Sequence, residues 1–353
     1  MEFLIFGFGS FFLAAILTPI VIFWAKKNGF VDNPKTHKHP AILHKKSIPR
    51  AGGLAIWLAI LPILLISVPI DKKILGIILA GSLVVLIGTL DDKYEISPYW
   101  RLFSNFAAAA IVVAAGVGIT AITSPLGGMI KLDSLRFSFD FFGPHSILVW
   151  ADLFALFWIV FIMNMLNWSS GVDGQLAGIV IIVALTLLVV SLKFIPLDPS
   201  QKSIATISAL VAGASLGFLI YNWHPAKIFP GYGATVLGFL IAVLAILSSG
   251  KVATALLVLA VPIIDGVLTI GRRIWQRKIP VWGDRAHFHH LLLDFGLSQR
   301  QIALFYWTVC AILGAISLYL KSLGKLLALF LLIFLIGGII LWFHLTYQKA
   351  KTK

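Results

Sequence analysis

Two adjacent carboxylates, Asp91 and Asp92, end a long apolar stretch of the sequence. A helix dipole disfavours anions at a helix C-terminus, and neighbouring carboxylates repel each other unless a cation or a proton relieves them. Hard divalent cations such as Mg²⁺ prefer oxygen ligands and phosphate partners. The pair therefore predicts metal binding or general-base chemistry, and the alternative is a solvated pair of loop acids.

A second polar segment, NMLNWSSGVDGQLAG at 164–178, separates two apolar stretches. Asparagine carbonyl oxygens such as that of Asn167 can ligate a metal, Asp173 adds a carboxylate, and the glycines allow a ligand to approach the backbone. The segment is therefore a candidate binding site. The alternative is a polar helix cap around Ser169 and Ser170.

A third segment, DRAHFHH at 284–290, places His287, His289 and His290 beside Arg285. A zinc site is one interpretation, but no cysteine is nearby and the spacing is not a usual zinc pattern. Hydrogen-bond donors clustered beside an arginine suit a diphosphate better. The remaining alternative is a solvated basic loop.

Further polar residues fall in loops or near the ends of apolar stretches. The loop 26–50 carries seven Lys and Arg residues and three histidines, which favours a membrane-surface loop attracted to anionic lipid. Asp265 lies within an apolar stretch, where a carboxylate is either functional or held by a buried hydrogen bond. Lys45, Lys46 and Arg50 of the loop 26–50 are candidates for holding a phosphate, and the loop histidines are His37, His39 and His44.

The elements that must position these residues are membrane helices. The 353 residues are 59% apolar and 12% charged with a mean hydropathy of +0.99, so the chain cannot cover a soluble surface. Apolar runs long enough to cross a bilayer recur throughout, and their lack of alternation argues against a barrel. We expect one all-α transmembrane bundle over 1–353, with about eleven spans and ten as the alternative count. They run near 3–24, 51–70, 74–90, 102–123, 147–163, 176–192, 203–221, 235–247, 252–271, 303–320 and 325–345.

Lys and Arg gather in the loops that follow odd-numbered spans, which predicts an outer N-terminus and a cytoplasmic C-terminus. The polar clusters fall on those same loops, so they share one membrane face. The alternating segment around 124–145 predicts a short external β-hairpin. The net charge of +14 sits in short loops, as in topology signals, and not on a nucleic-acid-binding face. Cys310 is the only cysteine, which excludes a disulfide within this chain.

Five motifs occur along most of the chain: IPRAGGLAI at 48–56, LDD at 90–92, NMLNxxxGVDG at 164–174, NWHPAKIFPG at 222–231 and DRAHFHH at 284–290. Together they resemble the polyprenyl-phosphate N-acetylhexosamine-1-phosphate transferases over roughly 1–345. The resemblance implies that a lipid phosphate attacks the β-phosphorus of a UDP-amino sugar. A lipid-linked diphospho-sugar forms and UMP is released, with Mg²⁺, or Mn²⁺ as the alternative, assisting at the cytoplasmic face of the plasma membrane.

The same resemblance implies roles for individual residues. Asp91 and Asp92 would activate the acceptor phosphate or hold metal, and Asn167 matches a metal-associated asparagine. Arg101 stands where the family usually has a phosphate-binding lysine, which keeps the charge but changes the geometry. The residues expected to bind substrate are Arg50, Arg101, Asp173, Lys227, Arg285, His287, His289 and His290. The partners implied are undecaprenyl phosphate or another polyprenyl phosphate and a UDP-amino sugar. Membrane lipid is a further expected partner, and a homodimer is an alternative to a single chain that the sequence leaves open.

Two positions depart from the family pattern. Ser170 replaces an aspartate that eukaryotic relatives also lack. Tyr232 occupies the position of an aspartate that holds Mg²⁺, and a neutral phenol is a poor Mg²⁺ ligand. The alternative to an active transferase is therefore a pseudoenzyme of the same fold that binds lipid phosphate or nucleotide sugar. A secondary transporter is disfavoured, because the polar residues lie at span ends and no internal repeat is visible.

Overall fold

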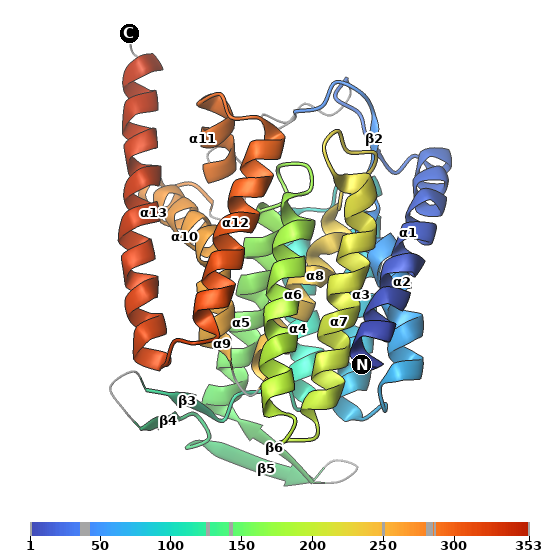
Figure 1. Cartoon of the computed structure of the whole chain (residues 1–353), viewed down its shortest axis with the longest axis vertical. Coiled ribbons are helices and arrows are strands. Elements are labelled where there is room, and N and C mark those ends of the chain that lie inside the picture. Colours follow the sequence, from blue (N-terminus) through green and yellow to red (C-terminus); the bar gives the residue numbers. More distant parts are fainter. Residues whose placement is uncertain are drawn as a thin grey trace.

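The computed structural model describes residues 2–35, 43–124, 128–140, 144–248, 251–279, 285 and 287–351, most of them helical. The long helices stand side by side as a bundle, with the two chain ends at opposite ends of it (Figure 1). The helices are α1 (Glu2–Asn28), α2 (Gly52–Ser67), α3 (Lys72–Tyr94), α4 (Pro98–Ala114), α5 (Val149–Trp168), α6 (Gln175–Phe194), α7 (Gln201–Asn222), η1 (Tyr232–Ala234), α8 (Thr235–Leu247), α9 (Val252–Val258), α10 (Ala260–Trp275), α11 (Phe288–Asp294), α12 (Gln299–Ser317) and α13 (Ser322–Lys351). The predicted helical membrane bundle is confirmed.

Seven helices in the described ranges are long and apolar enough to cross a membrane: α1, α3, α5, α6, α7, α12 and α13. The bent pair α9 and α10 would make eight. Helices α2 and α8 are apolar but shorter; α8, with 13 residues, is about 20 Å long against a hydrocarbon core of about 30 Å. The chain is thus a multi-pass membrane protein, and the expected count of about eleven spans is not confirmed.

The ninth expected span, 252–271, is not one straight helix. Helices α9 and α10 meet at an angle of 81°. Pro262, in the first turn of α10, has no N–H to donate to the carbonyl of Val258, so the helical hydrogen-bond ladder is interrupted there. After the bend, α10 runs obliquely to the other helices (Figure 1).

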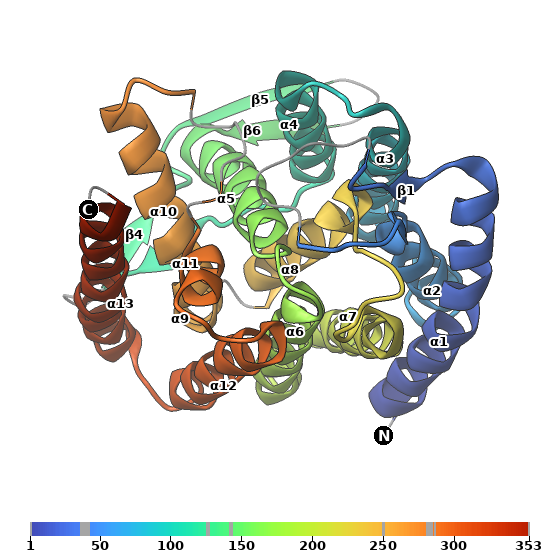
Figure 2. The ribbon, with the colours of Figure 1, turned by 90° about the horizontal axis from the view of Figure 1, so that it is seen from above.

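The core of the bundle is organised around α8, which Figure 2 shows near its centre. Every residue of α8 except the last is buried. Gly238 lets α8 touch α5, because an added Cβ would lie 2.7 Å from the Met163 Cα. Helices α1 and α7 approach as closely at Gly213, where an added Cβ would lie 2.0 Å from the carbonyl oxygen of Gly7. Small residues serve this purpose in membrane bundles, where packing rather than water exclusion holds helices together.

Short strands occur at both ends of the bundle. Near the cavity described below, β1 (Val31–Asp32) pairs with β2 (Ile48–Pro49). At the other end, β3 (Ala121–Thr123) pairs with β4 (Met129–Lys131), and β5 (Arg136–Asp140) pairs with β6 (Pro144–Leu148), all antiparallel (Figure 1). The single hairpin expected near 124–145 is therefore two hairpins. The fourth expected span, 102–123, is shorter than predicted, because α4 ends at Ala114 and the chain then forms β3.

Candidate active site

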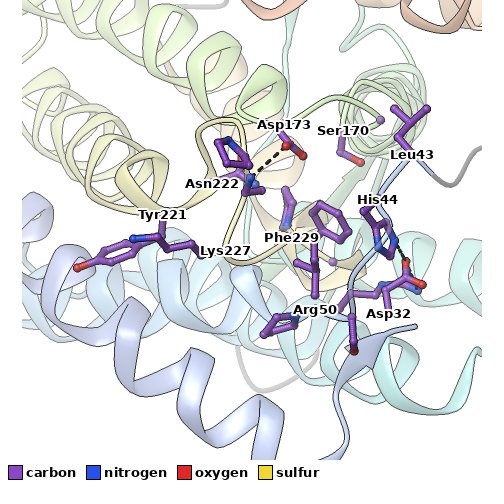
Figure 3. A pocket seen from close by; sticks show the side chains of 18 of the residues that line it. Asp32, Leu43, His44, Arg50, Ser170, Asp173, Tyr221, Asn222, Lys227 and Phe229 are labelled. Atoms are coloured by element: carbon purple, nitrogen blue, oxygen red, sulfur yellow. Dashed lines mark hydrogen bonds and ion pairs between the residues drawn. The ribbon is translucent and has the colours of Figure 1, made fainter. Parts of the chain in front are cut away.

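A cavity of about 1040 Å³ opens at the end of the bundle that carries β1 and β2. Five regions far apart in the sequence line it: the loop between α1 and α2, the α3–α4 junction, the α5–α6 junction, the loop between α7 and α8, and Gln299 at the start of α12. Of the predicted site residues, it is lined by Arg50, Arg101, Asn167, Asp173 and Lys227. We call this the polar cavity; Figure 3 shows part of its wall.

Asp91 and Asp92 lie in the last turn of α3, directly behind the cavity wall, and the side chains of both are fully buried. Asp91 Oδ1 accepts a hydrogen bond of 2.7 Å from Arg101 Nε. Asp92 Oδ1 accepts one of 2.8 Å from the backbone N–H of Tyr232 and lies 3.6 Å from Arg50 Nε. The two guanidinium groups therefore face the cavity, each backed by its own carboxylate. The alternative interpretation, in which Asp91 and Asp92 are solvated loop acids, is wrong because both side chains are buried at the end of a helix.

The segment that follows α7 closes the same wall. Phe229 donates its backbone N–H to the carbonyl of Pro49 at 2.8 Å, which brings the loop after α7 against β2. Gly231 has φ of +67° and ψ of −179°, and an added Cβ would lie 2.1 Å from Asp92 Oδ2. Only glycine adopts this backbone conformation readily. The turn thus delivers the Tyr232 N–H to Asp92.

Tyr232 lines the cavity but is itself almost fully buried. Its hydroxyl oxygen accepts a hydrogen bond of 3.1 Å from Asn105 Nδ2, and its ring lies 5.1 Å from the guanidinium carbon of Arg101. The resemblance implies a metal-binding aspartate at this position. Tyr232 instead contacts the Arg101 guanidinium group through the face of its ring.

The α5–α6 junction presents Asn167 and Asp173. Asp173 Oδ2 lies 2.7 Å from His224 Nδ1 and accepts a hydrogen bond of 3.1 Å from the backbone N–H of Ala226 (Figure 3). Helix α6 starts after Gly174, whose N–H donates to Asn222 Oδ1 at 3.1 Å. The loop after α7 thus fixes both the Asp173 carboxylate and the start of α6.

The serines of this junction do not cap α6. Ser169 Oγ donates to the carbonyl of Met165 at 3.1 Å, and Ser170 Oγ donates to that of Asn167 at 2.6 Å. Both carbonyls belong to the last turn of α5. The serines therefore do not cap the start of α6; Ser169 is instead the C-cap residue of α5, and both hydroxyls bind carbonyls of its last turn.

The three histidines of the segment 284–290 are buried behind the α5–α6 junction and do not line the polar cavity. The ring centroids of His287 and His289 lie 5.6 Å apart in parallel, and those of His289 and His290 lie 4.2 Å apart. Gly171 makes room for His289, because an added Cβ there would lie 2.2 Å from His289 Nε2. In the described structure these imidazoles therefore do not face the polar cavity, and their role in substrate binding stays a prediction.

Burial decides the protonation of this cluster. Burial, followed by repulsion from His290 and His287, lowers the pKa of His289 well below its usual value. Burial, followed by repulsion from His287 and Arg285, lowers the pKa of His290 to about 4. These two imidazoles are therefore neutral at pH 7.

Two more predicted residues belong to structural contacts near this cluster. Asp265 holds the start of α11: its Oδ1 accepts the backbone N–H of Phe288 at 2.8 Å, and its Oδ2 lies 3.2 Å from His287 Nδ1. The buried hydrogen bond proposed as one role for Asp265 is therefore what the structure contains. Arg285 donates to Asp294 Oδ1 at 2.8 Å and is not part of the cavity wall. Asp284 lies outside the described residues.

Sequence reasoning did not single out Asp32 and assigned His44 to a membrane-surface loop, yet both line the polar cavity. His44 Nε2 lies 3.5 Å from Asp32 Oδ2, and Arg50 NH1 lies 4.0 Å from the same oxygen (Figure 3). The available signal was a single acid, Asp32, inside the otherwise basic loop 26–50. Lys45 and Lys46 also line the cavity, whereas His37 and His39 lie outside the described residues.

The donor set fits one hard divalent cation shared with a substrate. Asp91 Oδ2 and Asp92 Oδ2 are buried oxygens without a hydrogen-bond partner, and Asn167 lies in the cavity wall. Proteins usually hold Mg²⁺ by one or two carboxylates together with substrate phosphates and water. Across the described ranges, no group of three His, Cys, Asp or Glu side chains forms a metal site from protein alone.

Comparisons with known proteins identify the family. The model of glycosyl transferase family 4 matches residues 74–249. A probable undecaprenyl-phosphate N-acetylglucosaminyl 1-phosphate transferase of Bacillus subtilis is 33% identical over 336 residues, which cover 93% of this chain and 87% of that protein. The chain belongs to glycosyl transferase family 4. The resemblance seen in its motifs is thereby confirmed, as is the expectation that it is an enzyme, a membrane transferase.

Two further relatives have related names. A decaprenyl-phosphate N-acetylglucosaminephosphotransferase of Mycolicibacterium smegmatis is 28% identical and covers 86% of this chain and 80% of its own length. An undecaprenyl-phosphate alpha-N-acetylglucosaminyl 1-phosphate transferase of Escherichia coli strain K12 is 29% identical. The alignment covers 92% of this chain and 88% of that protein. The stretch matched by the family 4 model contains Asn167, Asp173 and Tyr232 of the cavity wall and Asp91 and Asp92 behind it, whereas Arg50 lies outside the stretch.

Proposed function

We propose that this chain transfers N-acetylhexosamine-1-phosphate, most simply N-acetylglucosamine-1-phosphate, from a UDP-sugar to a polyprenyl phosphate. An acceptor phosphate oxygen attacks the β-phosphorus, the bond from that phosphorus to the bridging oxygen breaks, and UMP leaves. The observation that carries the proposal is the wall of the polar cavity, in which two guanidinium groups are backed by two buried carboxylates. The names of the relatives supply the substrate class.

Arg50, Arg101 and Lys227 bind phosphate in this proposal. Phosphoryl transfer depends mainly on positioning and charge neutralisation, and guanidinium groups match phosphate oxygens in geometry. Asp91 and Asp92 keep Arg101 and Arg50 aimed at the cavity, since each carboxylate contacts one of them. Asp173, fixed by His224 and the backbone of the α7–α8 loop, contacts the nucleotide.

Asp91, Asp92 and Asn167 would hold Mg²⁺, or Mn²⁺ in its place, through the free Oδ2 atoms and an amide oxygen. When bound, such an ion neutralises the diphosphate and its departing charge. The histidines 287, 289 and 290 act through the α5–α6 junction that they pack against, because their buried rings lie behind it. Arg285 supports α11 through Asp294.

The membrane topology is also part of the proposal. The ends of α1, α3, α5 and α7 and the starts of α2, α4, α6 and α8 meet around one cavity, so the short helices also run from one end of the bundle to the other. This alternation supports about eleven crossings in a single domain. The excess of Lys and Arg in the loops at the cavity end favours the cytoplasmic side for the site.

The test is release of UMP by the purified protein in detergent with undecaprenyl phosphate, UDP-GlcNAc and Mg²⁺. We expect turnover, its loss in Asp92→Asn, and its loss when the metal is chelated and return when Mg²⁺ is added back. Gly271→Ala is the matched control, since an added Cβ there meets nothing within 4 Å. Absence of UMP with every UDP-amino sugar would contradict the proposal.

The second candidate, a ligand-binding pseudoenzyme, is favoured by Tyr232 alone. If the tyrosine has abolished turnover, then Tyr232→Asp should restore UMP release while the wild-type protein still binds UDP-GlcNAc in calorimetry. If wild-type protein turns over and Tyr232→Asp is slower, the tyrosine belongs to the working site and the pseudoenzyme is excluded.

A further inference from the structure

Three lysines meet at the end of the bundle opposite the polar cavity, where α6, α9, α12 and α13 have their ends (Figure 1). Lys325, in the first turn of α13, is half-buried and donates to Thr254 Oγ1 at 2.6 Å. Lys251 lies one turn before Thr254, and its ammonium group is 4.7 Å from the ring centroid of Phe194. The neighbouring Lys193 donates to the carbonyl of Leu318 at 3.4 Å. We call Lys193, Lys251 and Lys325 the three-lysine cluster.

The cluster has no counter-ion among the described side chains. None of the three ammonium groups has a carboxylate oxygen within 4.0 Å, whereas Lys202, at the same end of the bundle, has Glu2 at 2.7 Å. The charges of Lys251 and Lys193 repel that of Lys325, and a half-buried ammonium group that contacts only a neutral hydroxyl is poorly compensated. An anion shared by the three groups would relieve both effects.

The surroundings of the cluster indicate which anion. Helices α12 and α13 carry exposed apolar side chains beside it, Ile316 on α12 and Leu323 and Leu327 on α13, and Tyr319 is 86% exposed at the turn between them. Exposed apolar helix faces with an aromatic residue at their end are typical of the boundary between acyl chains and headgroups. A free phosphate would use only the ammonium groups, but a phospholipid would also cover the apolar faces.

We propose that the three-lysine cluster binds the headgroup phosphate of an anionic phospholipid in the leaflet opposite the polar cavity. The acyl chains lie along α12 and α13, and the phosphate joins the ends of α6, α9 and α13. This site is separate from the cavity and does not depend on the reaction proposed for it.

The test is thermal unfolding of the full chain in neutral detergent, monitored by tryptophan fluorescence. The unfolding temperature is measured at increasing concentrations of phosphatidylglycerol, which gives an apparent Kd. A ligand that binds only the folded state raises the unfolding temperature. We expect phosphatidylglycerol to raise it and phosphatidylcholine or inorganic phosphate at the same concentration to leave it unchanged. Loss of two lysines near an anionic headgroup weakens binding by about 30-fold, so Lys193→Gln with Lys251→Gln should raise the apparent Kd by that factor.

The matched control is Lys72→Gln with Lys73→Gln, which removes two exposed lysines from the start of α3 at the same end of the bundle. This variant should keep the phosphatidylglycerol affinity within about 2-fold, because its charges act only through the general surface potential. In phosphatidylcholine the Lys193→Gln, Lys251→Gln protein should unfold at or above the wild-type temperature, since repulsion within the cluster is relieved. Unchanged phosphatidylglycerol affinity in this variant, an equal loss in the control, or equal protection by inorganic phosphate would overturn the proposal.

Discussion

Asp91 and Asp92 are neighbours in the sequence but have different partners in space. Successive residues of a helix point about 100° apart, so Asp91 reaches Arg101 on α4 while Asp92 reaches Arg50 and the turn before α8. The repulsion expected for adjacent acids is offset by one guanidinium group for each. The same two contacts bring the arginines to the cavity wall, so the pair organises the site whether or not its free oxygens hold a metal ion.

Gly231→Ala tests how strictly this site depends on its backbone. The new Cβ would overlap Asp92 Oδ2, and the conformation at φ of +67° costs a non-glycine residue about 1–3 kcal/mol. We expect loss of most UMP release and a lower unfolding temperature. Gly271→Ala should leave both near wild type or slightly raise the stability, because it improves helix propensity in open space. A fully active Gly231→Ala protein would show that the contact with Asp92 is dispensable.

The buried histidines predict a pH dependence of stability. Burial lowers the pKa of His290 from 6.5 to about 4 and also lowers the pKa of His289 well below its usual value, so the unfolded chain binds more protons than the folded one between about pH 6.5 and 4. Stability contributed by these groups is therefore complete above pH 6.5 and decreases as the pH falls. Thermal unfolding from pH 7.5 to 4.5 should show this slope, and His290→Gln should flatten it. An unchanged slope in that variant would assign the effect to other groups.

At the scale of elements, close contacts at glycines hold the bundle together. Helices in a membrane gain little from water exclusion, so their association depends on how closely the backbones pack. Gly213 on α7 lies against the α1 backbone at Gly7, and Gly238 on α8 lies against α5.

Gly213→Leu should separate α1 from α7. Overpacking a tight interface commonly costs about 1–3 kcal/mol, and a Cβ 2.0 Å from a backbone carbonyl cannot be accommodated by a rotamer change. We expect a clearly lower unfolding temperature and reduced UMP release. The control is Gly338→Leu on α13, where an added Cβ meets nothing within 4 Å and the temperature should change little. Equal effects of both substitutions would refute this account of the α1–α7 contact.

At the scale of the whole molecule, the two ends of the bundle differ in character. The end with the C-terminus carries the polar cavity, while the other carries the N-terminus, two hairpins and the three-lysine cluster (Figure 1). This polarity suits a reaction on one membrane face.

The proposed orientation predicts which positions react with a membrane-impermeant maleimide in intact cells. A cysteine in place of Ser134, between the hairpins, should be labelled, and one in place of Lys46, at the cavity, only after the membrane is permeabilised. Cys310 is buried, so the background should be low. The reverse pattern would place the cavity outside.

The sequence by itself determined the helical membrane character, the family and most of the residues that surround the cavity, because these depend on residue type and order. Arg50, Arg101, Asn167, Asp173 and Lys227 were found in this way. Composition and motif order do not depend on which helix packs against which, so both can be determined from a single sequence.

Only the tertiary structure decided which of these residues line the cavity and which lie behind its wall. It placed the histidines of 284–290 behind the α5–α6 junction, bent the ninth span after α9, and brought Asp32 and His44 to the cavity. Each depends on contacts between segments far apart in the chain, such as His289 with Gly171. Hydropathy and spacing describe each helix separately, and they carry no information on which neighbour covers a given face.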